Sequence, residues 1–220
     1  EAVSISSKEK TVELRNVETG ETTTESYDKL VLSPGASSFH PPLPGIDLPG
    51  IFHVRTVPDA RTIREWIAGG TSYLTGMFHY SGIQMVKPVR RAVVVGGGFI
   101  GLETAENLVH AGFDVTLIQK PNQVLGPLDP EVARLVEGHV ERNGVRLALN
   151  DGVTGFEQLV GGAIAVQTMS GKTYEGEIVI LAIGVRPNTA LAKSAGLEIG
   201  ERGGIRVDDH MRTSDPDIFA

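Results

Sequence analysis

Six residues in the middle of the chain, Gly96-Gly97-Gly98-Phe99-Ile100-Gly101, have the spacing of a phosphate-binding turn. In a turn of this kind the first glycine permits a tight bend and the second lets a pyrophosphate approach the backbone. The third glycine allows the following helix to pack close to the preceding strand. Gly96, Gly98 and Gly101 occupy these three positions. The free N–H groups and the dipole of a helix that starts here would favour negative phosphates.

The segments around this turn have the pattern of a strand, a helix and a second strand. Arg91 to Val95 is continuously apolar after its first residue, as expected for a parallel strand that is buried on both faces. Ile100 to His110 has helical spacing of apolar residues and precedes Gly112, and Val115 to Ile118 is a second strand. This context makes the glycine spacing indicate dinucleotide binding rather than a turn that serves tight packing alone.

Two polar residues follow the second strand, where dinucleotide-binding units usually carry an acidic residue that binds the adenosine ribose. This chain has Gln119 and Lys120 there. Gln119 could bond a ribose hydroxyl without repelling a 2′-phosphate, and Lys120 could pair with that phosphate. The site is therefore expected to discriminate weakly between NADH and NADPH. The alternative is a solvated Lys120 beside a glutamine that is merely tolerated.

The remaining segments predict an α/β fold with further strands before and after the nucleotide unit. We expect strands near the N-terminus with the last at Tyr27 to Leu32, and a proline-rich crossing at residues 40–45 that marks a domain boundary. The later predicted elements are a helix from Pro58 to Ile67 that Gly69-Gly70 stops, a loop over residues 71–87, a helix from Pro130 with Asp129 as N-cap, a parallel strand from Val145 to Leu149, an antiparallel meander over residues 155–168, a buried strand over residues 177–183 and a short strand near Ile205.

Composition excludes several classes of function. The formal net charge of −7 argues against a nucleic-acid-binding surface, and no apolar run approaches the roughly 20 residues of a membrane-spanning helix. The chain has no cysteine, so it contains no disulfide, thiolate nucleophile or cysteine-ligated metal. Its histidines are scattered, and no metal site is expected. We expect a cytoplasmic protein, without nucleic-acid or membrane partners.

Four segments in this order resemble the pyridine nucleotide-disulfide oxidoreductases, especially the branch of coenzyme A-disulfide reductases, persulfide reductases and NADH oxidases. They are Tyr27-Asp28-Lys29-Leu30-Val31-Leu32-Ser33-Pro34-Gly35-Ala36, Phe52-His53-Val54-Arg55-Thr56, the glycine turn with Leu102 and Glu103, and Ala182-Ile183-Gly184-Val185-Arg186-Pro187-Asn188. The resemblance implies a Rossmann-like, three-layer NAD(P)-binding domain with a parallel sheet and an antiparallel β-meander at residues 53–187. Parts of an FAD domain would flank it at residues 1–52 and 188–220.

The resemblance also assigns roles to residues outside the glycine turn. Ser33, Pro34 and Gly35 match the turn where the chain passes the flavin before it crosses to the NAD domain, and Gly184 matches the return turn. Glu103 matches an acidic residue near the contact of nicotinamide and flavin, although its position also suits the dipole of the helix's first turn. The residues from Thr213 to Ala220 look like the start of a second flavin motif.

Several parts of the family pattern are missing from the chain: the FAD-binding glycine turn, the redox-active cysteine and the C-terminal dimerisation domain. The resemblance therefore implies an internal fragment that is inactive alone, with no catalytic residue to name. In the parent, a homodimer, hydride would pass from NAD(P)H to FAD and on to a disulfide, persulfide or O₂. The alternatives are a ferredoxin-, rubredoxin- or nitrite-reductase-type flavoprotein of the same superfamily and a non-catalytic NAD(H)-sensing module.

Overall fold

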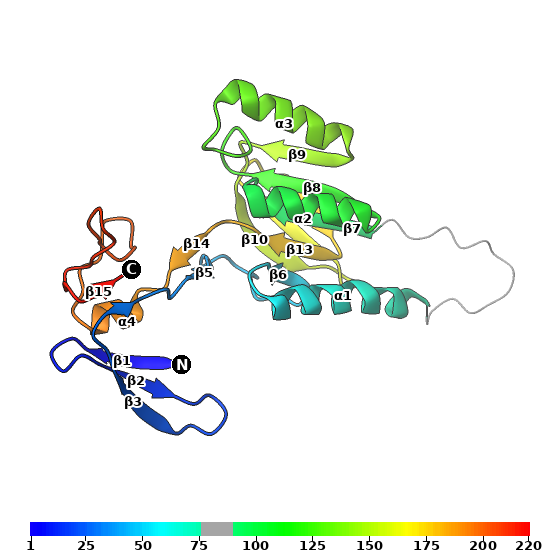
Figure 1. Cartoon of the computed structure of the whole chain (residues 1–220). Helices are drawn as coiled ribbons and strands as arrows, with labels where there is room; N and C mark the ends of the chain where they lie inside the picture. Colours follow the sequence, from blue (N-terminus) through cyan, green and yellow to red (C-terminus); the bar gives the residue numbers. More distant parts are fainter. Residues whose placement is uncertain (76–89) are drawn as a thin grey trace, which may run out of the picture. The chain divides into compact units, whose positions relative to one another are not determined.

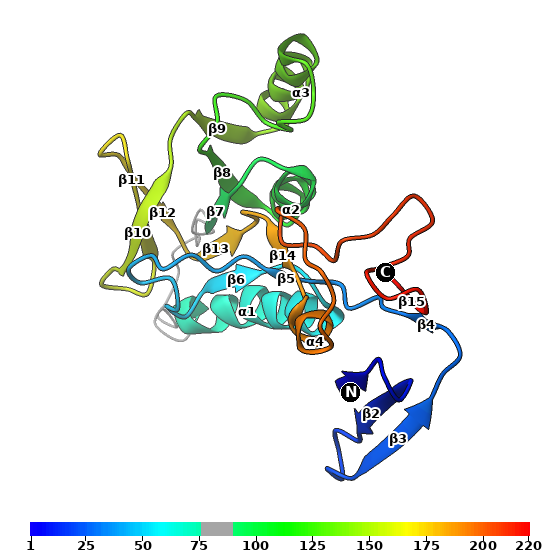
Figure 2. The same cartoon turned by 90° about the vertical axis from the view of Figure 1, so that its left-hand side faces the viewer.

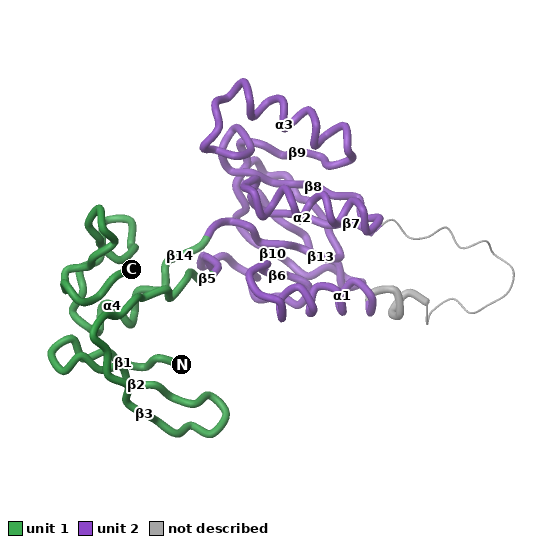
Figure 3. The backbone as a smooth tube through the Cα atoms, in the orientation of Figure 1, with its two compact units in different colours: residues 1–37, 185–220 green, residues 38–184 purple. Residues whose placement is uncertain are grey.

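The computed structural model describes residues 1–75 and 90–220 and divides into two compact units (Figure 3). Unit 1 combines Glu1–Ser37 with Val185–Ala220, and unit 2 is Ser38–Gly184. These bounds differ from the sequence-based boundaries at residues 52 and 187. The segment from residue 38 belongs to unit 2 because Ile46 packs into the same core cluster as Val93 and Val95.

Unit 2 is built on a five-stranded sheet with the strand order β6-β13-β7-β8-β9. All four neighbouring pairs are parallel. The strands are β6 (Ile51–His53), β13 (Ile178–Leu181), β7 (Arg90–Val95), β8 (Phe113–Gln119) and β9 (Val145–Leu149). The central strands are covered on both faces, which explains the continuous apolar run before the glycine turn.

The sheet of unit 2 is the middle of three layers (Figures 1 and 2). Ala92 and Val94 of β7 pack on the helix side, and Val93 and Val95 pack on the opposite side. The helices are α1 (Val57–Thr75), α2 (Phe99–His110) and α3 (Pro130–Arg142), and the other layer is the meander β10 (Val153–Gln158), β11 (Ile164–Thr168) and β12 (Thr173–Gly176). The predicted α/β class with a parallel sheet and an antiparallel meander is confirmed.

Unit 1 contains three small sheets and one short helix. Its elements are the antiparallel strands β1 (Ala2–Ser6), β2 (Thr11–Arg15) and β3 (Thr22–Ser26), the parallel pair β4 (Leu30–Val31) and β15 (Ile218–Phe219), the pair β5 (Ala36–Ser38) and β14 (Val185–Pro187), and α4 (Ala190–Ser194). Its buried core consists of Ile5, Ala192, Leu197 and Ile218.

Four predicted elements differ from the structure. The helix α1 continues past Gly69 to Thr75, because glycine keeps its backbone N–H and costs a helix only about 1 kcal/mol. The predicted loop over residues 71–87 is thus helical at its start, and residues 76–87 lie outside the described part. The strand expected over Tyr27 to Leu32 is reduced to Leu30–Val31, since Tyr27 instead bonds the carbonyl of Lys10. Near Ile205 there is only an isolated bridge to Ile199.

Candidate dinucleotide-binding site

The glycine turn begins at the carboxyl end of β7, and its first residue has a conformation that favours glycine. Gly96 has a φ of 109°, and its N–H donates a hydrogen bond of 2.8 Å to the carbonyl of Ile118 on β8. A Cβ atom at Gly96 would lie 2.3 Å from the carbonyl oxygen of Ala182. The turn is therefore held between β8 on one side and the end of β13 on the other.

The other two glycines of the motif have different surroundings. A Cβ atom at Gly101 would lie 1.9 Å from the carbonyl oxygen of Gly96, so only glycine lets α2 start this close to the turn. A Cβ atom at Gly98 would meet nothing within 4 Å. With a φ of −81°, Gly98 also has an ordinary backbone conformation. The fold itself does not require glycine at this position, and the open space above it is where a phosphate could approach.

The first turn of α2 presents uncapped backbone donors. Gly98 is the N-cap of the helix and supplies no side chain to its N–H groups. Such groups are satisfied by water or by a ligand, and the helix dipole favours an anion beside them. Phe99 and Ile100 are 65% and 43% exposed although both are apolar. Glu103 is exposed but lies one turn further along α2, so the sequence-based placement in the first turn of the helix was wrong.

The side chain of Gln119 joins the glycine turn to the loop that follows β8. Its Oε1 accepts a hydrogen bond of 2.8 Å from the N–H of Gly97, and its Nε2 donates one of 3.2 Å to the carbonyl of Gln123. An amide can play both parts because it has a donor and an acceptor, whereas a carboxylate only accepts. Gln119 thus fixes the turn from within, a role that the sequence did not predict.

The loop after β8 supplies further contacts to the turn that sequence reasoning missed. The N–H of Leu125 donates a hydrogen bond of 2.8 Å to the carbonyl of Gly97. Val124 is fully buried, and its side chain packs against Gly97. A Cβ atom at Gly97 would lie 3.1 Å from the Cγ1 of Val124. Gln123 donates to the carbonyl of Leu128 at 2.9 Å. No motif in the sequence signals these contacts, because they depend on how the loop folds back.

Lys120 lies at the same edge of the sheet as Gln119 and is exposed. Its stem runs beside Gly152, where a Cβ atom would be 3.4 Å from the Lys120 Cγ. In the described part of the chain its ammonium group forms no ion pair. The neighbouring carboxylate is already used: Asp151 is buried and accepts hydrogen bonds from the N–H and the Oγ of Ser170. Among the described residues, a cation without an ion-pair partner therefore lies next to a neutral amide.

Comparison with known proteins decides the family. The family model described as pyridine nucleotide-disulphide oxidoreductase matches residues 1–220. The chain belongs to this family. It is 36% identical over 213 residues to an NADH oxidase from Enterococcus faecalis. The matched residues make up 96% of this chain and 43% of that protein. The chain thus spans less than half the length of this curated relative.

Two solved structures of the oxidoreductase family superpose closely on the chain. Reduced Bacillus anthracis CoADR-RHD has a TM-score of 0.86 and 42% identity, covering 100% of this chain and 36% of that one. The water-forming NADH oxidase from Lactobacillus brevis, bound to NADH, has a TM-score of 0.83 and 32% identity, covering 100% and 44%. The resemblance seen in the four sequence segments is therefore confirmed.

The other residues that the family resemblance singled out are divided between the two units. Gly184 ends unit 2 with a φ of 104°, and its carbonyl accepts a hydrogen bond of 2.9 Å from Phe39. In unit 1, the carbonyls of Pro34 and Gly35 accept hydrogen bonds from the side chain and the N–H of Asn188. These contacts tie the two crossing segments of the oxidoreductase chain to each other. They show a structural role for Pro34, Gly35 and Gly184.

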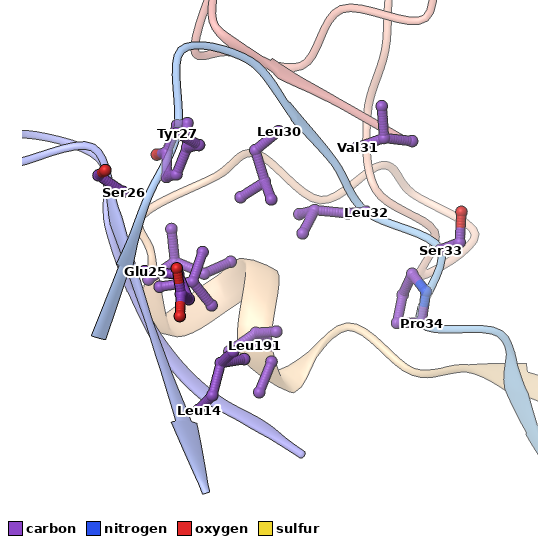
Figure 4. Close-up of a pocket in the computed structure, with 13 residues that line it drawn as sticks. Leu14, Glu25, Ser26, Tyr27, Leu30, Val31, Leu32, Ser33, Pro34 and Leu191 are labelled. Carbon is purple, nitrogen blue, oxygen red and sulfur yellow. The ribbon is translucent and has the colours of Figure 1, made fainter. Parts of the chain in front are cut away.

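Unit 1 also contains an apolar hollow of about 430 Å³ (Figure 4). Ser33 and Pro34 lie at one end of it and Tyr27 at the other, with Leu30, Leu32 and other apolar side chains between them. The hydroxyl of Tyr27 is buried and has no hydrogen-bond partner within the described ranges, and burial raises its pKa. Of the residues predicted to lie beside a flavin, Ser33 and Pro34 thus border an apolar space.

Within residues 1–75 and 90–220, no group of three or more histidine, aspartate or glutamate side chains could hold a metal ion. No helix in the same ranges is long and apolar enough to cross a membrane.

Proposed function

We propose that the chain is the NAD(P)H-binding domain of an FAD-dependent oxidoreductase. The observation that carries this proposal is the turn at Gly96 to Gly101. Gly96 and Gly101 are required by the fold, but Gly98 faces open space beside the uncapped start of α2. A glycine that the fold does not need, at the position where a pyrophosphate would approach, supports a binding role over a packing role.

The geometry indicates how the two halves of a bound dinucleotide would lie. The pyrophosphate would accept hydrogen bonds from the N–H groups of the first turn of α2. The residues at the end of β8 would face the adenosine half, since dinucleotide-binding folds contact the adenosine ribose at this strand end. Bound NAD(P)H supplies a hydride, and the chain's part is to orient the cofactor. We assign FAD and the acceptor, which is a disulfide, a persulfide or O₂, to the whole protein, and we infer a homodimer.

We further infer that the site accepts both NADH and NADPH. Gln119 carries no negative charge that would repel a 2′-phosphate, and Lys120 offers a cation without an ion-pair partner in the described part of the chain. Because both polar groups of the Gln119 amide already bind backbone atoms, its direct contribution to ribose recognition is small. The expected ratio of the two dissociation constants is below one hundred.

The proposal is tested by calorimetric titration of the 220-residue chain with NADH and, separately, with FAD. We expect saturable binding of NADH, no stoichiometric flavin after purification and no consumption of NADH in air. Absence of NADH binding would contradict the proposed dinucleotide site. A purified chain that carried stoichiometric yellow flavin and consumed NADH would contradict the assignment of FAD and turnover to the whole protein.

A further inference from the structure

A buried glycine in the loop after β9 lies beneath two side chains. Gly152 does not have a positive φ, so its backbone conformation is open to residues with a side chain. Its α-carbon is covered instead: a Cβ atom there would lie 2.8 Å from the Sδ of Met169 and 3.4 Å from the Cγ of Lys120. The methionine thioether and the lysine stem therefore lie over the same small residue, which leaves room for both.

The backbone on both sides of Lys120 is bound to the loop after β9. The N–H of Asp151 donates a hydrogen bond of 3.1 Å to the carbonyl of Gln119, and the N–H of Asn150 donates one of 2.8 Å to the carbonyl of Pro121. The side chain of Gln119 in turn holds the glycine turn. The base of the lysine side chain is therefore tied through its neighbours to the candidate phosphate site.

The turn between β11 and β12 is bound to the same loop. The N–H of Met169 donates a hydrogen bond of 2.8 Å to the carbonyl of Gly152. The carboxylate of Asp151, which is 5% exposed, accepts bonds of 3.0 Å from the N–H and 2.7 Å from the Oγ of Ser170. Hydrogen bonds to a charged group are strong, so they fix the turn on the loop. The backbone of Met169 is thus anchored, although the residue is 67% exposed.

The contact of these two side chains limits the directions that the lysine can take. A lysine has four rotatable side-chain bonds and loses much conformational freedom when a ligand orders it. Its apolar stem can pack on neighbouring atoms while the ammonium group stays in solvent, and an unbranched thioether adapts well to such a stem. A side chain that is already held in place costs less to order when the ligand binds.

We propose that Met169 is a positioning residue that holds the side chain of Lys120 ready for the 2′-phosphate of NADPH. This inference rests on the proposed function, because it requires the adenosine half of the dinucleotide to lie at the end of β8. NADH has no 2′-phosphate and gains nothing from the contact. The antiparallel meander, which lies outside the strand-turn-helix-strand unit, thereby contributes to the choice between the two cofactors.

The test compares the dissociation constants of NADH and NADPH in calorimetric titrations of the 220-residue chain at pH 8.0, where the 2′-phosphate is fully charged. Met169→Ala keeps the N–H that binds Gly152 but removes the thioether. We expect the ratio of the NADPH constant to the NADH constant to rise about threefold, because only the ordering of Lys120 is lost. Met169→Leu, a volume-conserving change, should keep the original ratio. Val160→Ala, at a fully exposed residue near the other turn of the meander, is the control and should also keep it.

A double variant separates positioning from a general loosening of the site. In a Lys120→Met chain, Met169→Ala should have no further effect on the ratio, since the group that it positions is gone. A rise that persists in this background, or an unchanged ratio in Met169→Ala, contradicts the positioning role while the dinucleotide site stands. Failure of the unmodified chain to bind either nucleotide contradicts the proposed function itself. Circular dichroism shows whether each variant is folded, and Met169→Ser supplies a second variant if Met169→Ala unfolds.

Discussion

The carboxamide of Gln119 binds the N–H of Gly97 at 2.8 Å, so the residue at the end of β8 holds the phosphate turn directly. The same amide donates to the carbonyl of Gln123. A residue type that seemed only to replace the usual acidic partner of the ribose therefore has a structural task of its own.

Gln119→Glu is expected to shift the cofactor preference toward NADH. The glutamate could still accept the bond from Gly97, but its negative charge would repel a 2′-phosphate and its oxygens could accept ribose hydroxyls. We expect the ratio of the NADPH to the NADH dissociation constant to rise at least tenfold in calorimetric titrations. Gln158→Glu, which adds the same charge on β10, is the control and should leave the ratio unchanged. An unchanged ratio in Gln119→Glu would show that this position does not face the ribose.

Lys120→Met is expected to weaken NADPH binding and to leave NADH binding unchanged. Methionine keeps much of the apolar stem that lies beside Gly152 but removes the ammonium group, which has no ion-pair partner in the described ranges. The loss of one partly exposed charge pair corresponds to roughly a fivefold weaker affinity for NADPH. Lys193→Met in α4 is the control. Equal weakening for both nucleotides would mean that Lys120 does not contact the 2′-phosphate.

Gly101→Ala is expected to destabilise unit 2. The new methyl group would lie 1.9 Å from the carbonyl oxygen of Gly96, so α2 or the turn must move. Overpacking of this kind costs about 1–3 kcal/mol in the free energy of unfolding, measured by urea denaturation. The matched control is Gly69→Ala in α1, where a methyl group meets nothing within 4 Å and the helix should gain about 0.5–1 kcal/mol. Equal stability of Gly101→Ala and the unmodified chain would contradict the close approach.

The stability of unit 1 is expected to depend on pH through Asp217. Hydrogen bonds from Lys10 and Lys29 lower the pKa of Asp217 to about 2. Because the pKa is depressed in the folded state, this contribution is present above the unfolded value near 4 and is lost as the pH falls toward 2. Asp217→Asn should therefore lower the midpoint of urea unfolding at pH 6 and have less effect at pH 2.5. Asp209→Asn, an exposed acid nearby in sequence, should do neither. A deficit of the same size at both pH values would argue against the linkage.

The sequence predicted those parts of the fold that depend on local patterns. The apolar strand at Arg91 to Val95, the helix after the glycine turn and the meander are each specified by periodicity and by turn residues close in sequence. The end of α1 was wrong because two glycines lower helix propensity without blocking backbone hydrogen bonds. The strand predicted over Tyr27 to Leu32 was too long, because only Leu30 and Val31 pair with β15, nearly the whole chain away in sequence.

The candidate site was predictable only in part for a similar reason. The glycine spacing identifies the turn, and the position of Gln119 after the second strand places it beside that turn. The contacts of Gln123, Val124 and Leu125 arise from the path of a loop that no motif describes. The position of Met169 beside Lys120 likewise joins residues that are far apart in the sequence. Such contacts depend on the tertiary fold, and no local sequence pattern indicates them.

We propose that the space above Gly98 receives the pyrophosphate of NAD(P)H, and one substitution at this glycine is a direct test. A methyl group at Gly98 meets no protein atom within 4 Å and needs no unusual backbone angle, so Gly98→Ala should fold normally. The measurement is the NADH dissociation constant of this variant beside those of the unmodified chain and Gly69→Ala. We expect at least tenfold weaker binding for Gly98→Ala alone. Unchanged binding by a correctly folded Gly98→Ala chain would contradict it.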